Sequence, residues 1–393
     1  MNLTSNRGVD LVKFQGRRSE SGWEQEDTSC ACALCACPAF VVFARALHEV
    51  HKAHEADTPT QRKNMAVKTL DEQMMRLAVD TAVDARLRSR PNPWVGAVVV
   101  ATDGQVFCGA TLQPGEAHAE VVALQKAGAR SQGATLYTTL EPCSHTGRTG
   151  PCTQAIVLAK IARVVVGVID PDKHVAGSGI QQLRDAGITV DVGVEQKLVA
   201  QQLAPYLHHR RTGRPYVILK MAMTLDGRVA MPDSSQWITG ETARMRVHQL
   251  RAESDAILVG AGTVRADNPS LTTRDVEGPS PRRVVLGNVS PTDNVHPCLE
   301  WTGSLPDLLD TLGSEGVIQL MVEGGPRVAT SFHNEHLINQ YVLHLAPIIA
   351  GGSESPHALD KSADMSPMMN GHIVSTQVLD NDIEIILEPT STY

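Results

Sequence analysis

Two neighbouring stretches decide how this chain should fold: GEAHAEVVALQKAG at residues 115–128 and ATLYTTLEPCSHTGRTGPC at residues 134–152. In the first, apolar residues recur at helical spacing, which predicts a helix from about His118 to Gly128. The second opens with a strand over residues 135–140, which delivers a cysteine at its end. A helix followed by a short apolar strand is typical of an α/β domain, in which helices cover a sheet.

The same stretches hold a group of metal-binding residue types. His118, Cys143 and Cys152 offer one imidazole and two thiolates, and Glu120 follows closely after the histidine. A tetrahedral zinc ion with three such ligands keeps a fourth position for water, as catalytic zinc sites do. Each residue alone would more often serve packing, but His-x-Glu followed by Pro-Cys matches zinc nucleobase deaminases, whose glutamate transfers protons. We therefore predict Zn²⁺ at these three ligands and a catalytic role for Glu120.

The composition limits the classes of protein to which the chain can belong. Its 393 residues exceed one ordinary domain, and hydrophobic residues make up 42%, enough for buried cores. The formal net charge of −8, without a long basic run, argues against general nucleic-acid binding. No apolar run approaches the length of a membrane span. The eight cysteines are clustered, which favours a reducing, cytoplasmic location over a secreted disulfide framework.

The first 64 residues differ from the rest in composition. They are rich in charged and small polar residues and contain CACALCAC at residues 30–37. One interpretation is a small metal or iron–sulfur site, but the spacing is too cramped for the usual zinc-ribbon pairs. We favour an extension at residues 1–64 without defined structure, or sequence upstream of a true start at Met65.

The remainder divides into two α/β parts. Residues 65–207 are expected to form the first domain, beginning with a helix whose capping box is Thr69 and Glu72 and ending with a connecting helix over residues 195–207. The polar stretch HHRRTGRP at 208–215 is expected to be the boundary, so that the second domain spans residues 208–393. Further strands are expected at 95–101, 163–170, 216–223, 256–260, 282–286, 318–322, 341–347 and 383–389, and helices at 239–253, capped by Thr239, and 305–312.

The segment between the two cysteines points to a particular family. Eight residues separate Cys143 from Cys152, where the nucleobase-deaminase signature has two. Together with PNPWVG at 91–96, the long form EPCSHTGRTGPC resembles the bifunctional deaminase–reductase of riboflavin biosynthesis, from about residue 70 to near the C-terminus. The resemblance implies an α/β fold, with a cytidine-deaminase-like three-layer N-terminal domain and a dihydrofolate-reductase-like C-terminal domain that uses NADPH.

In the first domain the resemblance assigns substrate-binding residues. It implies that Asn92 and a loop with Ser144, His145 and Arg148 bind a phosphoribosyl pyrimidinone, and a basic, hydroxyl-rich loop is chemically suited to a phosphate. The sequence departs from the family pattern at Gly150, where proline is commoner, and in DPDKHVAG at 170–177.

The second domain lacks a dinucleotide-binding Gly-x-Gly-x-x-Gly fingerprint but carries LKMAMTLDGRVA, SSQWITG, GAGTVRADNPSLTTR and VEGGP, which resemble the reductase half of the same family. The implied cofactor-binding residues are Met223, Trp237, Thr263, Asp267, Gly324, Gly325 and Pro326, with the backbone at the start of the following helix meeting the phosphates. The implied substrate-binding residues are Ser235, Arg251, Leu271, Arg274 and Glu323. Lys220 and Glu323 are the candidates for handling the sugar oxygens and protons.

These observations predict a two-step enzyme. Zinc-dependent hydrolytic deamination of 2,5-diamino-6-ribosylamino-4(3H)-pyrimidinone 5′-phosphate would precede NADPH-dependent reduction of the ribosyl to a ribityl side chain. We expect a cytoplasmic homo-oligomer that acts on this small molecule and binds neither nucleic acid nor membrane. Three alternatives stay open: a deaminase with an idle second domain, a nucleic-acid base deaminase, which the acidic charge disfavours, and a structural zinc protein, which should show a fourth ligand.

Overall fold

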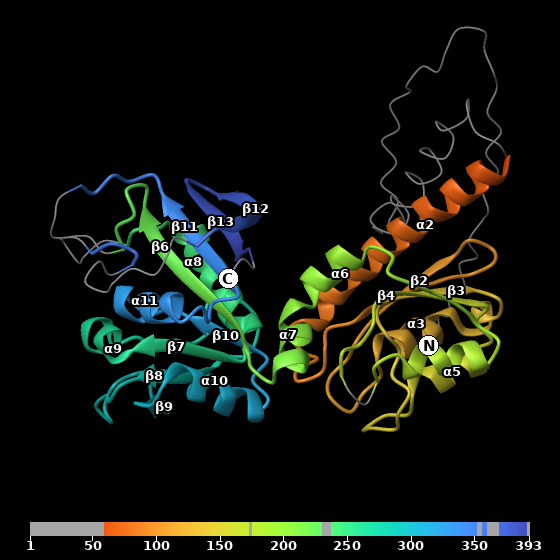
Figure 1. The fold of residues 1–393 in the computed structure, drawn as a ribbon, viewed down its shortest axis with the longest axis horizontal. Coiled ribbons are helices and arrows are strands. Elements are labelled where there is room, and N and C mark those ends of the chain that lie inside the picture. Colours follow the sequence, from red (N-terminus) through yellow and green to blue (C-terminus); the bar gives the residue numbers. More distant parts are fainter. Residues whose placement is uncertain (1–58, 173–174, 230–236, 352–355, 360–368, 391–393) are drawn as a thin grey trace, which may run out of the picture.

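The computed structural model describes residues 59–172, 175–229, 237–351, 356–359 and 369–390, with side chains from residue 67 on. The chain forms two lobes that lie side by side, and the helices α6 (Gln196–Gln202) and α7 (Ala204–Thr212) run between them (Figure 1). The cysteine-rich segment at 30–37 and Ser235 lie outside the described residues.

The first lobe is a five-stranded sheet covered on both faces. The strand order is β2-β1-β3-β4-β5, with antiparallel pairing of β1 to β2 and β3, and parallel pairing of β3, β4 and β5. The strands are β1 (Gly96–Val100), β2 (Val106–Ala110), β3 (Thr135–Leu140), β4 (Arg163–Val168) and β5 (Thr189–Val192). The helices are α2 (Pro59–Ala82), α3 (Ala119–Ala127), α4 (Cys152–Leu158) and α5 (Ser178–Asp185), with 3-10 turns at Val83–Ala85 and Gly128–Ser131.

Two glycines set how closely the helices approach this sheet. A Cβ atom at Gly96 would lie 1.9 Å from the carbonyl oxygen of Ala78 in α2, and one at Gly109 would lie 2.3 Å from that of Ala119 in α3. Because Gly96 and Gly109 are adjacent in the β1–β2 register, α2 and α3 press on opposite faces of the same hairpin. The sheet therefore fixes the start of α3, where His118 and Glu120 lie.

The second lobe is built on an eight-stranded sheet with the order β12-β13-β11-β6-β10-β7-β8-β9. The strands from β11 to β9 in this order are parallel, and β12 and β13 are antiparallel additions at one edge. The strands are β6 (Tyr216–Thr224), β7 (Ala256–Gly260), β8 (Arg282–Leu286), β9 (Cys298–Trp301), β10 (Gln319–Val322), β11 (Gln340–Ala346), β12 (Gly371–Leu379) and β13 (Asp382–Pro389).

Alternation along β6 shows how the helices cover this sheet. Ile218 packs with Val247 and Leu250 of α8 (Glu241–Glu253). Leu219 faces the opposite side, in the cluster that holds residues of α10 (Leu305–Ser314) and α11 (Pro326–Asn334). Successive residues of a strand point to opposite faces, so Lys220 lies on the α8 side. The short helix α9 (Ala261–Asp267) follows β7 directly.

Most of the predicted elements are present, but three predicted boundaries are wrong. Thr69 lies inside α2, which begins at Pro59, so Thr69 and Glu72 form no capping box. The N-cap of α8 is Gly240 rather than Thr239. The connecting helix predicted to end at residue 207 continues as α7 to Thr212, since a proline in the first turn of α7 and a left-handed Gly213 after it delimit a helix.

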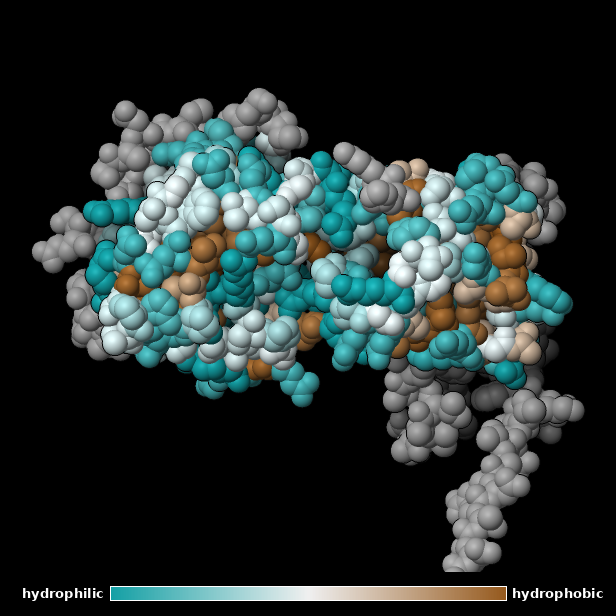
Figure 2. Space-filling view, turned by 90° about the horizontal axis from the view of Figure 1, so that it is seen from below, coloured by the Kyte–Doolittle hydropathy of each residue, from teal (hydrophilic) through white to brown (hydrophobic). Residues whose placement is uncertain are grey.

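The space-filling view shows hydrophobic residues in separate patches on the two lobes, interspersed with hydrophilic residues (Figure 2). The face in that view therefore has no single apolar surface running over both lobes. Within the described residues, no helix combines the length and apolar character needed to cross a membrane.

Candidate active sites

The structure brings the three predicted metal ligands together at one end of the first lobe. His118 is the N-cap of α3, Cys152 is the first residue of α4, and Cys143 follows β3. The Nδ1 atom of His118 lies 3.6 Å from Sγ of Cys143 and 3.3 Å from Sγ of Cys152. All three ligand atoms lie within 4.8 Å of one another, which is close enough for one ion to contact them all.

The surroundings favour a negatively charged sulfur at Cys143. The helix N-termini of α3 and α4 bring partial positive charge to the cluster, and the backbone N–H of Cys152 donates to Sγ of Cys143 at 3.4 Å. Hydrogen bonding from the Cys152 thiol lowers the pKa of Cys143 to about 4, and in turn the pKa of Cys152 is raised. One imidazole and two sulfurs suit Zn²⁺, and in the described part of the chain no other His, Cys, Asp or Glu joins this group.

Glu120 lies in the first turn of α3 beside the ligand cluster. Its side chain is buried, with 3% of the residue exposed, and burial raises its pKa to about 7. A carboxyl group with such a pKa can both accept and release a proton near neutral pH. Its environment therefore suits a group that transfers protons rather than one that stays ionised.

The predicted substrate loop projects from the same end of the lobe. Ser144 Oγ lies 2.6 Å from Oγ of Ser178 at the start of α5, which fixes the base of the loop. His145 and Arg148 are exposed at its tip, and Asn92 is half-buried in the loop before β1. The loop that joins Cys143 to Cys152 therefore carries two exposed basic side chains.

In the second lobe, Lys220, Glu323 and Arg251 form a charged group on the α8 side of the sheet. Val322 pairs with Leu219 in the register of β10 and β6, so that Glu323 comes next to Lys220. Arg251 donates from Nη2 to Oε2 of Glu323 at 2.7 Å and from Nη1 to the carbonyl oxygen of Thr272 at 3.2 Å. Burial lowers the pKa of Lys220, while the Glu323 charge opposes this effect. The predicted substrate-binding Arg251 therefore also holds the predicted catalytic Glu323.

The predicted cofactor residues Gly324, Gly325 and Pro326 form the turn from β10 into α11. Gly325 is the N-cap of α11 and makes no side-chain cap, so the helix start offers backbone N–H groups. A Cβ atom at Gly325 would lie 3.7 Å from Oγ1 of Thr263 in α9, which places Thr263 beside this turn. At Gly324 a Cβ atom would come within 2.5 Å of the Val328 side chain, so this turn must be glycine to pack.

The other predicted residues of this lobe are more scattered. Met223 packs against the core on the α11 side, Asp267 is exposed at the end of α9, and Trp237 is 78% exposed with the Arg244 guanidinium 5.5 Å from its ring centroid. Leu271 is buried and Arg274 is exposed.

Each of the two lobes matches a different protein-family model. Residues 68–168 match the cytidine and deoxycytidylate deaminase zinc-binding region, and residues 215–385 match the RibD C-terminal domain. The riboflavin biosynthesis protein RibD of Bacillus amyloliquefaciens is 38% identical over 346 residues, which is 79% of this chain and 93% of that protein. The chain belongs to the RibD family.

Solved RibD structures share this fold. RibD of Acinetobacter baumannii superposes with a TM-score of 0.76 at 34% identity, over 82% of this chain and 100% of that one. A diaminohydroxyphosphoribosylaminopyrimidine deaminase/5-amino-6-(5-phosphoribosylamino)uracil reductase of Thermotoga maritima gives 0.73 at 32% identity, over 82% and 99%. The predicted fold class is confirmed: a cytidine-deaminase-like lobe precedes a reductase lobe of the RibD type.

Family membership also confirms the predicted kind of activity. The chain is a bifunctional RibD enzyme, with a deaminase domain of the zinc-binding family and a reductase domain, and its activity is consistent with riboflavin biosynthesis. The deaminase family accounts for zinc, and the reductase domain indicates a nicotinamide cofactor. The substrate class is a small pyrimidine.

The sequence analysis missed Glu141, a buried carboxylate two residues before the candidate metal ligand Cys143. Its Oε1 accepts from the backbone N–H groups of Gly179 and Ile180 at 2.9 and 3.2 Å, and its Oε2 from those of Asp170 and Gly177 at 3.2 and 3.0 Å. Four donors on one buried carboxylate fix the start of α5, which holds Ser144 through Ser178. In the sequence, the acidic Glu141 directly follows the strand at 135–140, and this position could have indicated a buried carboxylate.

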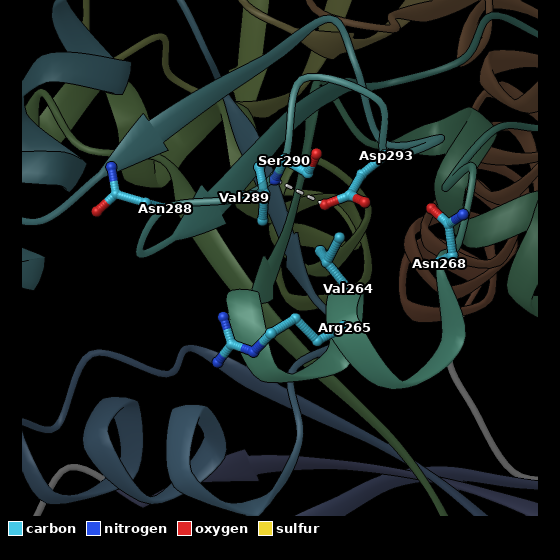
Figure 3. A pocket seen from close by; sticks show the side chains of 7 residues that line it. All are labelled: Val264, Arg265, Asn268, Asn288, Val289, Ser290 and Asp293. Atoms are coloured by element: carbon cyan, nitrogen blue, oxygen red, sulfur yellow. Dashed lines mark hydrogen bonds between the residues drawn. The ribbon is translucent and has the colours of Figure 1, made fainter.

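The sequence analysis also missed a cavity of about 460 Å³ between α9 and residues 288–293. Its walls come from α9 and from the loop after β8 (Figure 3). The lining residues are Val264, Arg265, Asn268, Asn288, Val289, Ser290 and Asp293. The cavity lies beside the helix that carries Thr263 and Asp267, and its volume falls in the range of small-molecule sites.

Proposed function

We propose that this enzyme first deaminates 2,5-diamino-6-ribosylamino-4(3H)-pyrimidinone 5′-phosphate with zinc and then uses NADPH to reduce the ribosyl group of the product to ribityl. The observation that carries the first step is the cluster of His118, Cys143 and Cys152 with the buried Glu120 beside it. The similarity to the Thermotoga deaminase/reductase over most of both chains supports the pairing of the two steps.

For deamination, His118, Cys143 and Cys152 would hold the metal. Zinc, when bound, supplies a Lewis acid that lowers the pKa of water to about 7. Glu120 takes the proton from the attacking water and passes it to the departing amine. Its buried position keeps that proton away from bulk solvent, and its raised pKa suits both transfers.

The substrate would be held at both of its ends. Asn92 approaches the pyrimidinone from the loop before β1, and the 144–149 loop approaches the phosphate with Ser144, His145 and Arg148. The exposed guanidinium of Arg148 can donate in pairs to phosphate oxygens, as arginine does more effectively than lysine.

For reduction, Lys220 and Glu323 would act on the sugar. The nicotinamide cofactor, when bound, supplies the hydride. Lys220 would donate a proton to a sugar oxygen, and its lowered pKa makes that proton easier to release. Arg251 keeps Glu323 in place, and Ser235, Leu271 and Arg274 would complete the contacts to the sugar phosphate.

NADPH would bind along the C-terminal ends of the parallel strands. The α11 start at Gly324, Gly325 and Pro326 would take the phosphates, with Thr263 beside it. Met223, Trp237 and Asp267 would complete the cofactor site. The cavity between α9 and residues 288–293 would take the far end of the dinucleotide, where Arg265 provides a cation for the additional phosphate of NADPH.

We further propose that the enzyme is cytoplasmic and forms a homo-oligomer. Among the described residues, Cys143, Cys152 and Cys298 form no disulfide, in keeping with a reducing compartment. The edge strand β12 exposes Ile373 and Val378 at 61% and 73%, and an edge strand with exposed apolar side chains can pair with another chain. Light scattering on the purified protein would measure the mass, and a monomer would contradict the oligomer.

One coupled assay tests the proposed function. The purified enzyme receives the diaminopyrimidinone phosphate with NADPH or with NADH, with and without a zinc chelator. We expect ammonia release and NADPH oxidation, with both lost after chelation because the second step depends on the product of the first. NADPH oxidation should persist in chelated enzyme when the deaminated compound is supplied. No oxidation of NADPH with that compound would refute the reductase assignment.

A further inference from the structure

The loop that carries Asn92 is fastened to the second lobe by Arg90. The Nη1 atom of Arg90 lies 3.3 Å from Oδ1 of Asp255, and Nη2 donates to the carbonyl oxygen of Ala252 at 2.5 Å. The side chains of Arg90 and Asp255 are only 13% and 18% exposed, so solvent screens this ion pair weakly. Ala252 belongs to the last turns of α8, and Asp255 directly precedes β7.

Asp255 is a rigid anchor. Its second carboxylate oxygen, Oδ2, accepts the backbone N–H groups of Ile318 and Gln319 at 2.9 Å each. Its own backbone N–H donates to the carbonyl oxygen of Gln319 and its carbonyl accepts from Arg282. Because these bonds join the starts of three strands, Asp255 cannot shift toward Arg90 without disturbing the reductase sheet.

The loop on the other side of this contact is equally tight. Ser89 is fully buried, and its hydroxyl donates to the carbonyl oxygen of Asn92 at 3.1 Å. The backbone N–H of Asn92 donates back to the carbonyl oxygen of Ser89 at 2.8 Å. A displacement of Arg90 is therefore transmitted to Asn92.

The α8 segment that receives Arg90 also serves the second site. Ala252 presents its carbonyl oxygen to Arg90, and its neighbour Arg251 holds Glu323. The loop of one candidate site and the catalytic carboxylate of the other are thus fixed to adjacent residues of one helix.

We propose that Arg90 is a positioning residue for deamination, through which the reductase lobe sets the place of Asn92 against the pyrimidine. The proposal rests on the proposed substrate contact of Asn92. Arginine suits this task because its planar fork reaches two acceptors on different elements, whereas lysine offers a single charged point. Substrate binding in the first lobe therefore depends on the docking of the second.

The variant Arg90→Ala tests this in the zinc-loaded full chain. A second cross-lobe ion pair, Arg86 with Glu253 at 3.0 Å, remains to keep the lobes docked. We expect the KM for deamination to rise roughly tenfold, with kcat changed by less than about twofold, since Glu120 and the metal ligands are untouched. Zinc content and reduction of the deaminated compound should stay at the wild-type level. Arg90→Lys should recover part of the loss.

Three further variants make the result decisive. Arg76→Ala removes an arginine–carboxylate pair with Glu195 that joins α2 to the start of α6 within the first lobe, and its KM should be that of the wild type. Asn92→Ala should raise the KM by itself, and adding Arg90→Ala to it should raise the KM little more. A wild-type KM in Asn92→Ala would refute the Asn92 contact, and with it the route by which Arg90 acts. A raised KM in Asn92→Ala with a wild-type KM in Arg90→Ala, or fully additive effects, would overturn the Arg90 proposal alone.

Discussion

The two candidate sites of this enzyme are assembled in different ways. The deaminase site takes its metal ligands and its proton-transfer group from residues 118–152, and their positions follow from two helix starts and one strand end. The reductase site joins Lys220, Arg251 and Glu323 from three elements that are far apart in the sequence. A metal demands particular atoms at one point, whereas a dinucleotide is bound largely by backbone at strand and helix ends.

Because the two sites share no residue, we expect that a substitution can inactivate one of them and leave the other active. Replacing the ligand in Cys152→Ser should abolish zinc binding and reduce deamination to background, because two protein ligands hold zinc too weakly. NADPH oxidation with the deaminated compound should be unchanged. Metal analysis and the two separate assays check this. Cys298→Ser, which alters a half-buried thiol of the other lobe, serves as the control and should keep its zinc.

Lys220→Met is the reciprocal change in the reductase site. It keeps an unbranched side chain of similar size and removes the ammonium group, and should lower kcat for reduction by roughly 10²-fold or more. Deamination should keep its wild-type rate. The exposed Lys197→Met is the matched control. A Lys220→Met enzyme that reduces at the normal rate would make Lys220 a structural residue only.

Glu141→Gln tests whether the deaminase site depends on its buried support. An amide cannot accept four backbone N–H groups, since its own NH₂ would face some of them. We expect a rise of roughly tenfold in the KM for deamination, through Ser178 and Ser144, with zinc retained. The exposed Glu116→Gln should behave as wild type. Equal KM values for the two variants would show that Glu141 does not support substrate binding.

Gly325→Ala should have the smallest effect. The added methyl group would lie 3.7 Å from Thr263 Oγ1, an ordinary contact, so the fold should be kept. The methyl would nevertheless narrow the approach to the α11 N-terminus, and we expect the KM for NADPH to rise by roughly a few-fold. The KM for the pyrimidine, measured on the same preparation, serves as the control. An unchanged KM for NADPH would argue against phosphate binding at this turn.

Helices and strands could be predicted from the sequence where their residue types agree with their burial in the fold. The strand at 135–140 has the same bounds in the structure, because its threonine, leucine and tyrosine residues favour a strand and all but the first are buried. The short helix α9 was not predicted, since its opening glycines are typical of turns. β9 has only four residues, and β12 is exposed at almost every position, so neither has a distinctive apolar pattern.

In the candidate sites, too, some features have a local sequence pattern and others do not. His118, Glu120, Cys143 and Cys152 could be proposed from the types of residue and their order along the chain, because zinc chemistry restricts both. The pairing of Arg251 with Glu323, the four donors on Glu141 and the Arg90 bridge depend on contacts between distant segments. A single sequence does not encode such contacts in any local pattern.

The most direct test of the central claim, two separate chemistries in fixed order on one chain, uses Glu120→Gln. NADPH oxidation is followed with the diaminopyrimidinone phosphate and then with its deaminated product. We predict no oxidation above roughly 10⁻² of the wild-type rate with the first compound, and the full wild-type rate with the second. Wild-type oxidation of NADPH by Glu120→Gln with the diaminopyrimidinone phosphate would contradict the account.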